Sequence, residues 1–193
     1  MAGLMRGAVL ARAAGLLVLS ALTLAILGRG LTLSSGGVLW FIHLVDLVFH
    51  EAGHPIFGLF GRFMGALGGS LNQVLIPAVC TGSFLWRGQL AAAAVTLFWT
   101  GENLVDVAIY VADGRDMKLP LLAEGLTHDW NWILSELSLR NQAEPIGRAV
   151  FGLGVLVLLA ALALLAYDLL RVLAAPASAD VLSSAATPDR KAR

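Results

Sequence analysis

The sequence is poor in charged residues and in cysteine. Asp, Glu, Lys and Arg make up 13% of its 193 residues, about half their share in an average soluble domain. That content is too low to cover a water-facing surface, and the hydrophobic share of 58% is too high for a disordered chain. Acidic and basic residues are equal in number, so no positive excess is present to bind nucleic acid. The single cysteine, Cys80, excludes an internal disulfide and a cysteine-based zinc site.

Long apolar runs are abundant instead. A transmembrane helix needs about 20 mostly apolar residues, and four stretches of the chain satisfy this requirement. We expect spans at about 7–27, 37–63, 83–111 and 149–170. The sequence therefore predicts an all-α, multi-pass helical membrane protein, with residues 1–175 as one integral membrane domain. Residues 176–193 are rich in Ala, Ser and Pro and are predicted to be a disordered polar tail.

The segment at 65–82 is less regular. Its apolar centre of about ten residues is too short to span a bilayer, and it contains Pro77 between flanking glycines. We therefore expect a short re-entrant or interfacial segment there. Lys and Arg are more frequent in the two tails and around the 62–87 connection than on the opposite side. The positive-inside rule then predicts that both termini are cytoplasmic.

The most specific pattern is His50-Glu51-Ala52-Gly53-His54. Histidines at i and i+4 of a helix differ by about 40° around its axis, so both rings face one point. Neutral imidazole nitrogens are good zinc ligands, and a glutamate beside the first ligand can act as a general base. Because ionisable residues inside an apolar span usually mark function, we predict Zn²⁺ bound by His50 and His54, with Glu51 as the catalytic residue.

Two further polar residues share the face of these histidines. His43 and Asp46 lie on the same helical stripe, where they are expected to orient ligands or to hold substrate. A hydrogen-bond network that joins helices without any metal is the alternative interpretation of this stripe.

A catalytic zinc takes three protein ligands and keeps one position for water. Glu102 and Asp106 share one stripe of the 83–111 span, and His128 is the only histidine outside the first stripe. These three residues are the candidates for the third ligand, with Glu102 and His128 ranked ahead of Asp106. The choice between them stays open.

Amide side chains complete the predicted site. Asn72 and Gln73 are expected to hydrogen-bond an extended substrate, and Asn103 to orient ligands or hold substrate. In the polar loop that follows, Asp129 and Trp130 are expected to hold the chain at the membrane surface, next to a short amphipathic stretch.

The run from Phe49 to Pro55, inside an apolar span, resembles the site-2 protease family of intramembrane zinc metalloproteases. The resemblance covers residues 37–63 and indicates a divergent member. It implies cleavage of membrane-embedded or membrane-proximal peptides, with an aspartate ligand on a later helix, for which Asp106 is a positional analogue.

Two other functions use the same residues. A metal-dependent membrane hydrolase can act on a lipid amide or ester, and a non-catalytic membrane protein can simply bind the metal. Glu51 distinguishes the hydrolases from the binding protein, because a binding site needs no general base beside its ligand.

Overall fold

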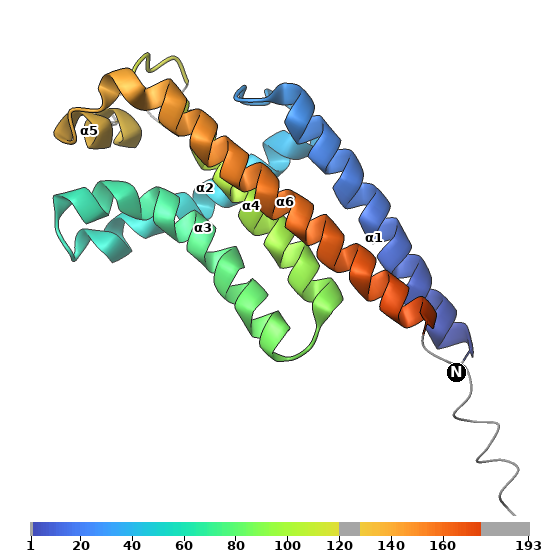
Figure 1. Ribbon diagram of the computed structural model, residues 1–193. Helices are drawn as coiled ribbons and strands as arrows, with labels where there is room; N and C mark the ends of the chain where they lie inside the picture. The colour runs from blue at the N-terminus through green and yellow to red at the C-terminus, as the bar shows by residue number, and fades with distance from the viewer. Residues whose placement is uncertain (1, 120–127, 175–193) are drawn as a thin grey trace, which may run out of the picture.

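The computed structural model describes residues 2–119 and 128–174, and these residues are all-helical, as predicted (Figure 1). The predicted tail at 176–193 lies outside the described residues. In chain order the elements are α1 (Ala2–Arg29), α2 (Gly37–Gly58), α3 (Arg62–Trp86), α4 (Leu90–Asp113), α5 (Asp129–Glu136), the 3-10 turn η1 (Arg140–Gln142) and α6 (Ala143–Ala174).

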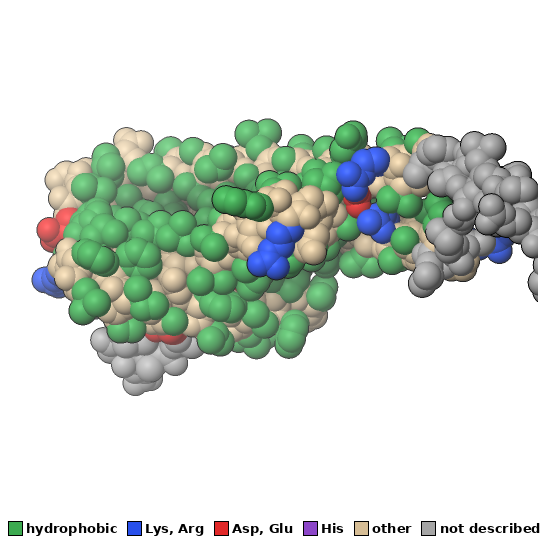
Figure 2. Space-filling view, turned by 90° about the horizontal axis from the view of Figure 1, so that it is seen from below, with side chains coloured by type: hydrophobic (Ala, Val, Ile, Leu, Met, Phe, Trp, Pro, Cys, Tyr) green, Lys and Arg blue, Asp and Glu red, His purple; other side chains and the backbone are tan. Residues whose placement is uncertain are grey.

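Three of the described helices are long and apolar enough to cross a membrane: Met5–Arg29, Arg62–Trp86 and Arg140–Ala174. The first and third of these lie side by side (Figure 1). An ion pair of 2.7 Å between Arg12 and the fully buried Asp168 joins them. One face of the molecule is covered mostly by apolar side chains, with few charges (Figure 2). These features fit an integral membrane protein.

The segment predicted to be re-entrant is instead the middle of α3, a continuous helix of 25 residues. The bounds of the neighbouring predicted spans differ as well, because α2 ends at Gly58 and α4 begins at Leu90. The turns fall at Gly61 and Gly88, whose φ angles of 103° and 67° favour glycine. The glycines inside the 65–82 segment do not break the helix, because they allow α3 to pack closely against α2.

α2 and α3 approach each other very closely. A Cβ atom added to Gly53 would collide with the backbone carbonyl of Gly68. The Asn72 side chain donates a 2.7 Å hydrogen bond to the carbonyl oxygen of Phe49 just beyond this crossing. Small residues allow such contact between membrane helices. The glycines that resemble helix breakers in the sequence thus serve helix packing.

α3 bends partway along its length, so that it runs first beside α2 and then beside α4 (Figure 1). Pro77 lies inside this helix and has no N–H to offer to the carbonyl of Gln73. A proline in a helix interior commonly produces such a bend. The bend leaves the Gln73 side chain between α2 and α4, where it hydrogen-bonds to both helices.

α4 is the most enclosed helix and packs mainly against α6. At their crossing, a Cβ on Gly101 would lie 3.0 Å from the carbonyl oxygen of Gly154, so the backbones are nearly in contact. Val105 and Leu158 are fully buried beside this crossing. On its other side, α4 packs against α3 and hydrogen-bonds to α2 through polar side chains.

Candidate metal centre

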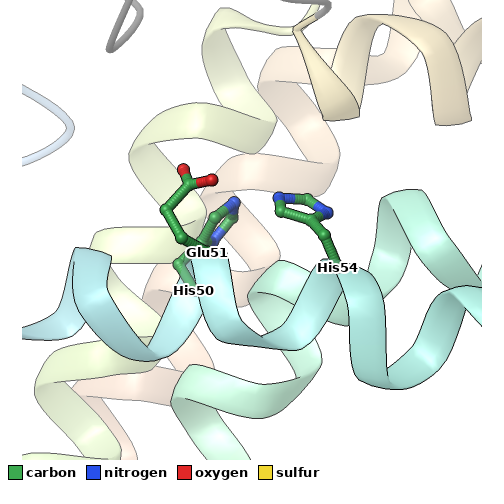
Figure 3. Close-up of side chains that lie close together, drawn as sticks. All are labelled: His50, Glu51 and His54. Atoms are coloured by element: carbon green, nitrogen blue, oxygen red, sulfur yellow. The ribbon is translucent and has the colours of Figure 1, made fainter.

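His50, Glu51 and His54 form a compact group on one side of α2 (Figure 3). Each residue offers one potential ligand atom, and these atoms all lie within 4.8 Å of one another. The two imidazole rings are 4.9 Å apart between centroids and inclined at 75°. The i, i+4 spacing thus brings both rings to one point, as the sequence predicts.

Both imidazoles are oriented by acceptors on α3. His54 donates from Nδ1 to the backbone carbonyl of Gly65 at 2.9 Å. His50 donates from Nδ1 to the side-chain carbonyl of Gln73 at 2.6 Å. A hydrogen bond at one ring nitrogen fixes the tautomer and leaves the other nitrogen as the ligand atom. Both Nε2 atoms are therefore available for a metal.

Both Nε2 atoms face the same carboxylate oxygen. Asp129 Oδ2 lies 3.2 Å from His50 Nε2 and 3.4 Å from His54 Nε2. With bonds of about 2.0–2.1 Å, the ligand atoms of a tetrahedral zinc site are about 3.3–3.4 Å apart. The two histidines and Asp129 therefore offer donor types that zinc accepts, and Asp129 Oδ2 lies at a compatible distance from each Nε2 atom.

Asp129 is the first residue of α5, and this short helix is fixed by hydrogen bonds on either side of the site. Trp130 Nε1 donates to Ser70 on α3 at 3.0 Å, and Asn131 Nδ2 donates to the carbonyl of Gly114, just after α4, at 2.8 Å. A carboxylate in the first helical turn is also favoured by the helix dipole. These contacts hold the Asp129 carboxylate over α2.

A cavity of about 500 Å³ adjoins the group and is lined mainly by apolar atoms. Glu51 is exposed to this cavity, which gives its carboxylate access to water and substrate. Leu44 and Leu47 of α2 and Val107 of α4 form part of the apolar lining.

Glu102, one of the predicted third ligands, does not lie at the histidine pair. Its carboxylate is fully buried and is 3.5 Å from Arg29 Nη2 at the end of α1. It also lies beside the carboxyl group of Asp46 on α2. Asp46, predicted to orient a ligand, accepts a 2.7 Å bond from Trp99 Nε1 and is buried away from the cavity.

Asp106 and His43 line the cavity but bind each other, with His43 Nδ1 2.9 Å from Asp106 Oδ1. The Tyr110 hydroxyl lies 3.5 Å from the other ring nitrogen of His43. Asp106 reaches His50 only through Gln73, whose Nε2 donates to Asp106 Oδ2 at 3.4 Å. The structure thus connects Asp106 to the candidate ligands through an intermediate residue.

His128, the remaining predicted ligand, caps the N-terminus of α5. Its Nδ1 accepts a 3.2 Å hydrogen bond from the backbone N–H of Asn131, and its Nε2 lies 3.4 Å from Asp113 Oδ2. Both ring nitrogens therefore face groups other than the histidine pair. His128 positions Asp129 by starting the helix that carries it.

The predicted amides also have structural partners. Asn72 holds α3 against α2 through Phe49, and Asn103 accepts a 3.2 Å bond from Gln73 Nε2. Asp129 is the contact that the sequence interpretation missed, because it treated this residue as a surface anchor. One available signal was its place directly before an amphipathic stretch, where the first helical turn presents a carboxylate.

Replacing Gly69 with alanine is expected to displace the His50 ring. A Cβ at this position would lie 2.5 Å from His50 Nε2 and 2.7 Å from two ring carbons, far inside van der Waals contact. The Zn²⁺ affinity of Gly69→Ala, measured by chelator competition, should fall at least tenfold. Gly82→Ala is the matched control, since a Cβ there meets nothing within 4 Å in the same helix. Equal affinities in the two variants would contradict the described packing.

No protein-family model, curated protein or solved structure matches the chain. The functional interpretation therefore depends on the geometry and chemistry of these residues.

Proposed function

We propose that this protein is a zinc-dependent membrane hydrolase that cleaves peptide bonds in or near the bilayer. The observation that carries this proposal is the convergence of His50 Nε2 and His54 Nε2 on Asp129 Oδ2, at 3.2 and 3.4 Å, beside the Glu51 carboxylate. A group that only joined helices would not need a glutamate exposed to a cavity at this point.

The roles of the residues follow from their positions. His50, His54 and Asp129 would hold the zinc ion, which, when bound, polarises a carbonyl and lowers the pKa of water to about 7. The Glu51 carboxylate accepts a proton from a water molecule in the cavity and returns it to the leaving nitrogen. The apolar atoms that line most of the cavity lower the local dielectric constant and so strengthen these polar interactions.

A lipid amide or ester is the second candidate substrate. The apolar atoms that dominate the cavity lining suit an acyl chain, and within the described ranges there is no strand edge that could pair with an extended peptide backbone. The same residues would perform the hydrolysis, so the choice of substrate class is a question for assay.

For the placement in the membrane, we propose a multi-pass arrangement with both termini cytoplasmic. The ends of α1 and α6 that adjoin the termini lie at the same end of the molecule (Figure 1). Arg12 and Arg171 are located there, and both bind the buried carboxylate of Asp168. This end therefore carries the basic residues that the positive-inside rule assigns to the cytoplasm.

Metal analysis of the purified full-length protein tests the proposal. We expect one zinc per chain, its removal by a chelator, and recovery of hydrolysis on adding Zn²⁺ back. A pool of quenched fluorescent peptides and a pool of fluorescent acyl amides and esters, both in detergent micelles, distinguish the two substrate classes. A wild-type protein that binds no stoichiometric metal, or that hydrolyses both pools equally well without it, would refute the proposed function.

A further inference from the structure

The amide of Gln73 determines which nitrogen of His50 can bind a metal. A glutamine side chain accepts hydrogen bonds at its carbonyl end and donates them at its NH₂ end. With the carbonyl toward His50, as described, the imidazole carries a proton on Nδ1, and Nε2, which faces Asp129 Oδ2 at 3.2 Å, is the nitrogen that a metal can bind. A flipped amide would donate to Nδ1 instead, which would place the proton on Nε2 and prevent it from binding a metal.

Two oxygen atoms of α4 decide the orientation of this amide. Gln73 Nε2 donates to Asn103 Oδ1 at 3.2 Å and to Asp106 Oδ2 at 3.4 Å. In the flipped orientation the Gln73 carbonyl oxygen would face both of these oxygens. The other oxygen of Asp106 already accepts from His43 Nδ1 at 2.9 Å. Since an ionised carboxylate offers only acceptors, Asp106 cannot adapt to a flipped amide.

The orientation of the Asn103 amide is likewise fixed by the groups that accept its hydrogen bonds. Its Nδ2 donates to Asp46 Oδ1 at 3.2 Å and to the backbone carbonyl of Trp99 at 2.9 Å. Both partners are acceptors, so Asn103 must present its own carbonyl to Gln73. Asp46 and Asn103 are both fully buried, where a polar group that loses its hydrogen-bond partner cannot bind water instead. The orientation of the Asn103 amide therefore determines that of the Gln73 amide, and the Gln73 amide determines which nitrogen of His50 carries a proton.

We propose that Asp106 and Asn103 are positioning residues, which act through the Gln73 amide to hold His50 with its proton on Nδ1 and Nε2 free for a metal. Neither Asp106 nor Asn103 contacts His50 directly; both bind the Gln73 amide, which accepts the hydrogen bond from His50 Nδ1. The consequence for metal affinity rests on the proposed function, whereas the His50 tautomer can be measured in the metal-free protein.

The first test is Asp106→Asn. The new asparagine keeps its carbonyl toward the His43 N–H and therefore turns its NH₂ group toward the NH₂ group of Gln73. Only Asn103 Oδ1 then holds the Gln73 amide in its wild-type orientation, so the flipped orientation gains population. With ring-¹⁵N histidine in the metal-free, full-length protein, NMR should show that the share of His50 protonated on Nδ1 falls, whereas Nε2 faces the Asp129 carboxylate in both proteins; the chain has four histidines to assign. The Co²⁺ dissociation constant should rise about 10–100-fold, as for other lost partners of metal ligands.

The double variant Asp106→Asn with Gln73→Glu is the stronger test, because it moves the negative charge from position 106 to position 73 and leaves the net charge of the protein unchanged. A carboxylate at position 73 has no donor to offer, so it accepts from His50 Nδ1 and from the new asparagine, while Asn103 Oδ1 loses the hydrogen bond that it accepts in the wild type. The double variant should return the proton to His50 Nδ1 and recover part of the Co²⁺ affinity that Asp106→Asn loses. A purely structural role of Asp106 predicts no such rescue.

Asp168→Asn is the matched control. Asp168 is buried like Asp106, but it binds Arg12 and Arg171 instead of the residues that connect Asp106 to His50. The control variant should change neither the His50 tautomer nor the Co²⁺ affinity.

An unchanged protonation of His50 Nδ1 in Asp106→Asn, or a double variant that binds Co²⁺ no better than Asp106→Asn, would overturn the proposal. If Asp106→Asn does not fold, Gln73→Met supplies a separate test, in which His50 should lose its preference for Nδ1–H. A wild-type protein with His50 protonated on Nδ1 that binds no Co²⁺ would refute the proposed function but not this inference.

Discussion

Replacing Glu51 with glutamine is expected to slow hydrolysis by about 10²–10⁴-fold, the usual contribution of a general acid–base residue, while bound zinc is retained. The amide has nearly the shape of the carboxylate but cannot accept the proton of water. Zinc content by mass spectrometry and initial rates on the substrate pool that the wild type hydrolyses provide the two measurements.

Glu144→Gln is the control for this substitution, because Glu144 is an exposed residue of α6 that pairs with Arg148. It should leave both quantities unchanged. A Glu51→Gln protein that binds zinc and hydrolyses at the wild-type rate would show that Glu51 is not the base. If neither the wild type nor the variant hydrolyses either pool although both bind zinc, the site is a binding site without catalysis.

Replacing Asp129 with alanine is expected to weaken zinc binding by more than 100-fold, because loss of a ligand should exceed the roughly 10–100-fold effect of losing a ligand's hydrogen-bond partner. Glu102→Ala should retain zinc, since Glu102 contacts Arg29 and Asp46 instead of the histidine pair. Competition with a chromophoric chelator measures both affinities. Asp116→Ala, in the exposed turn after α4, controls for the loss of a carboxylate.

The reverse result would be equally clear. Zinc retained by Asp129→Ala and lost from Glu102→Ala would mean that the third ligand comes from α4, which is one of the alternatives that the sequence left open, and that α5 has no direct role at the site.

α1, α6 and the His50–His54 turn were predictable because each depends on local information. A run of more than 20 apolar residues is sufficient to indicate a membrane helix, and the i, i+4 spacing is sufficient to align two rings. Neither requires knowledge of a partner. The course of α3 was not predictable in this way, because glycine and proline were interpreted as helix breakers, whereas packing against α2 and a bend at Pro77 accommodate them.

Asp129, the proposed third ligand, could not be identified from a helical stripe. A stripe gives the direction in which Glu102 faces but not its height along the neighbouring helix. The structure places Glu102 beside Asp46, four residues before His50, which is about 6 Å along α2. Asp129 lies on a separate short helix, and its approach to α2 depends on contacts of α5 with α3 and with the end of α4.

α3 supplies the acceptor for both imidazoles, with the Gly65 carbonyl for His54 and the Gln73 amide for His50. The orientations of the two proposed ligands on α2 therefore both depend on the position of α3. A slip of α3 along α2 by one residue, about 1.5 Å, would remove both hydrogen bonds together instead of one at a time. The alignment of the histidines is in this sense all-or-none, and it depends on the axial register of a single helical hairpin.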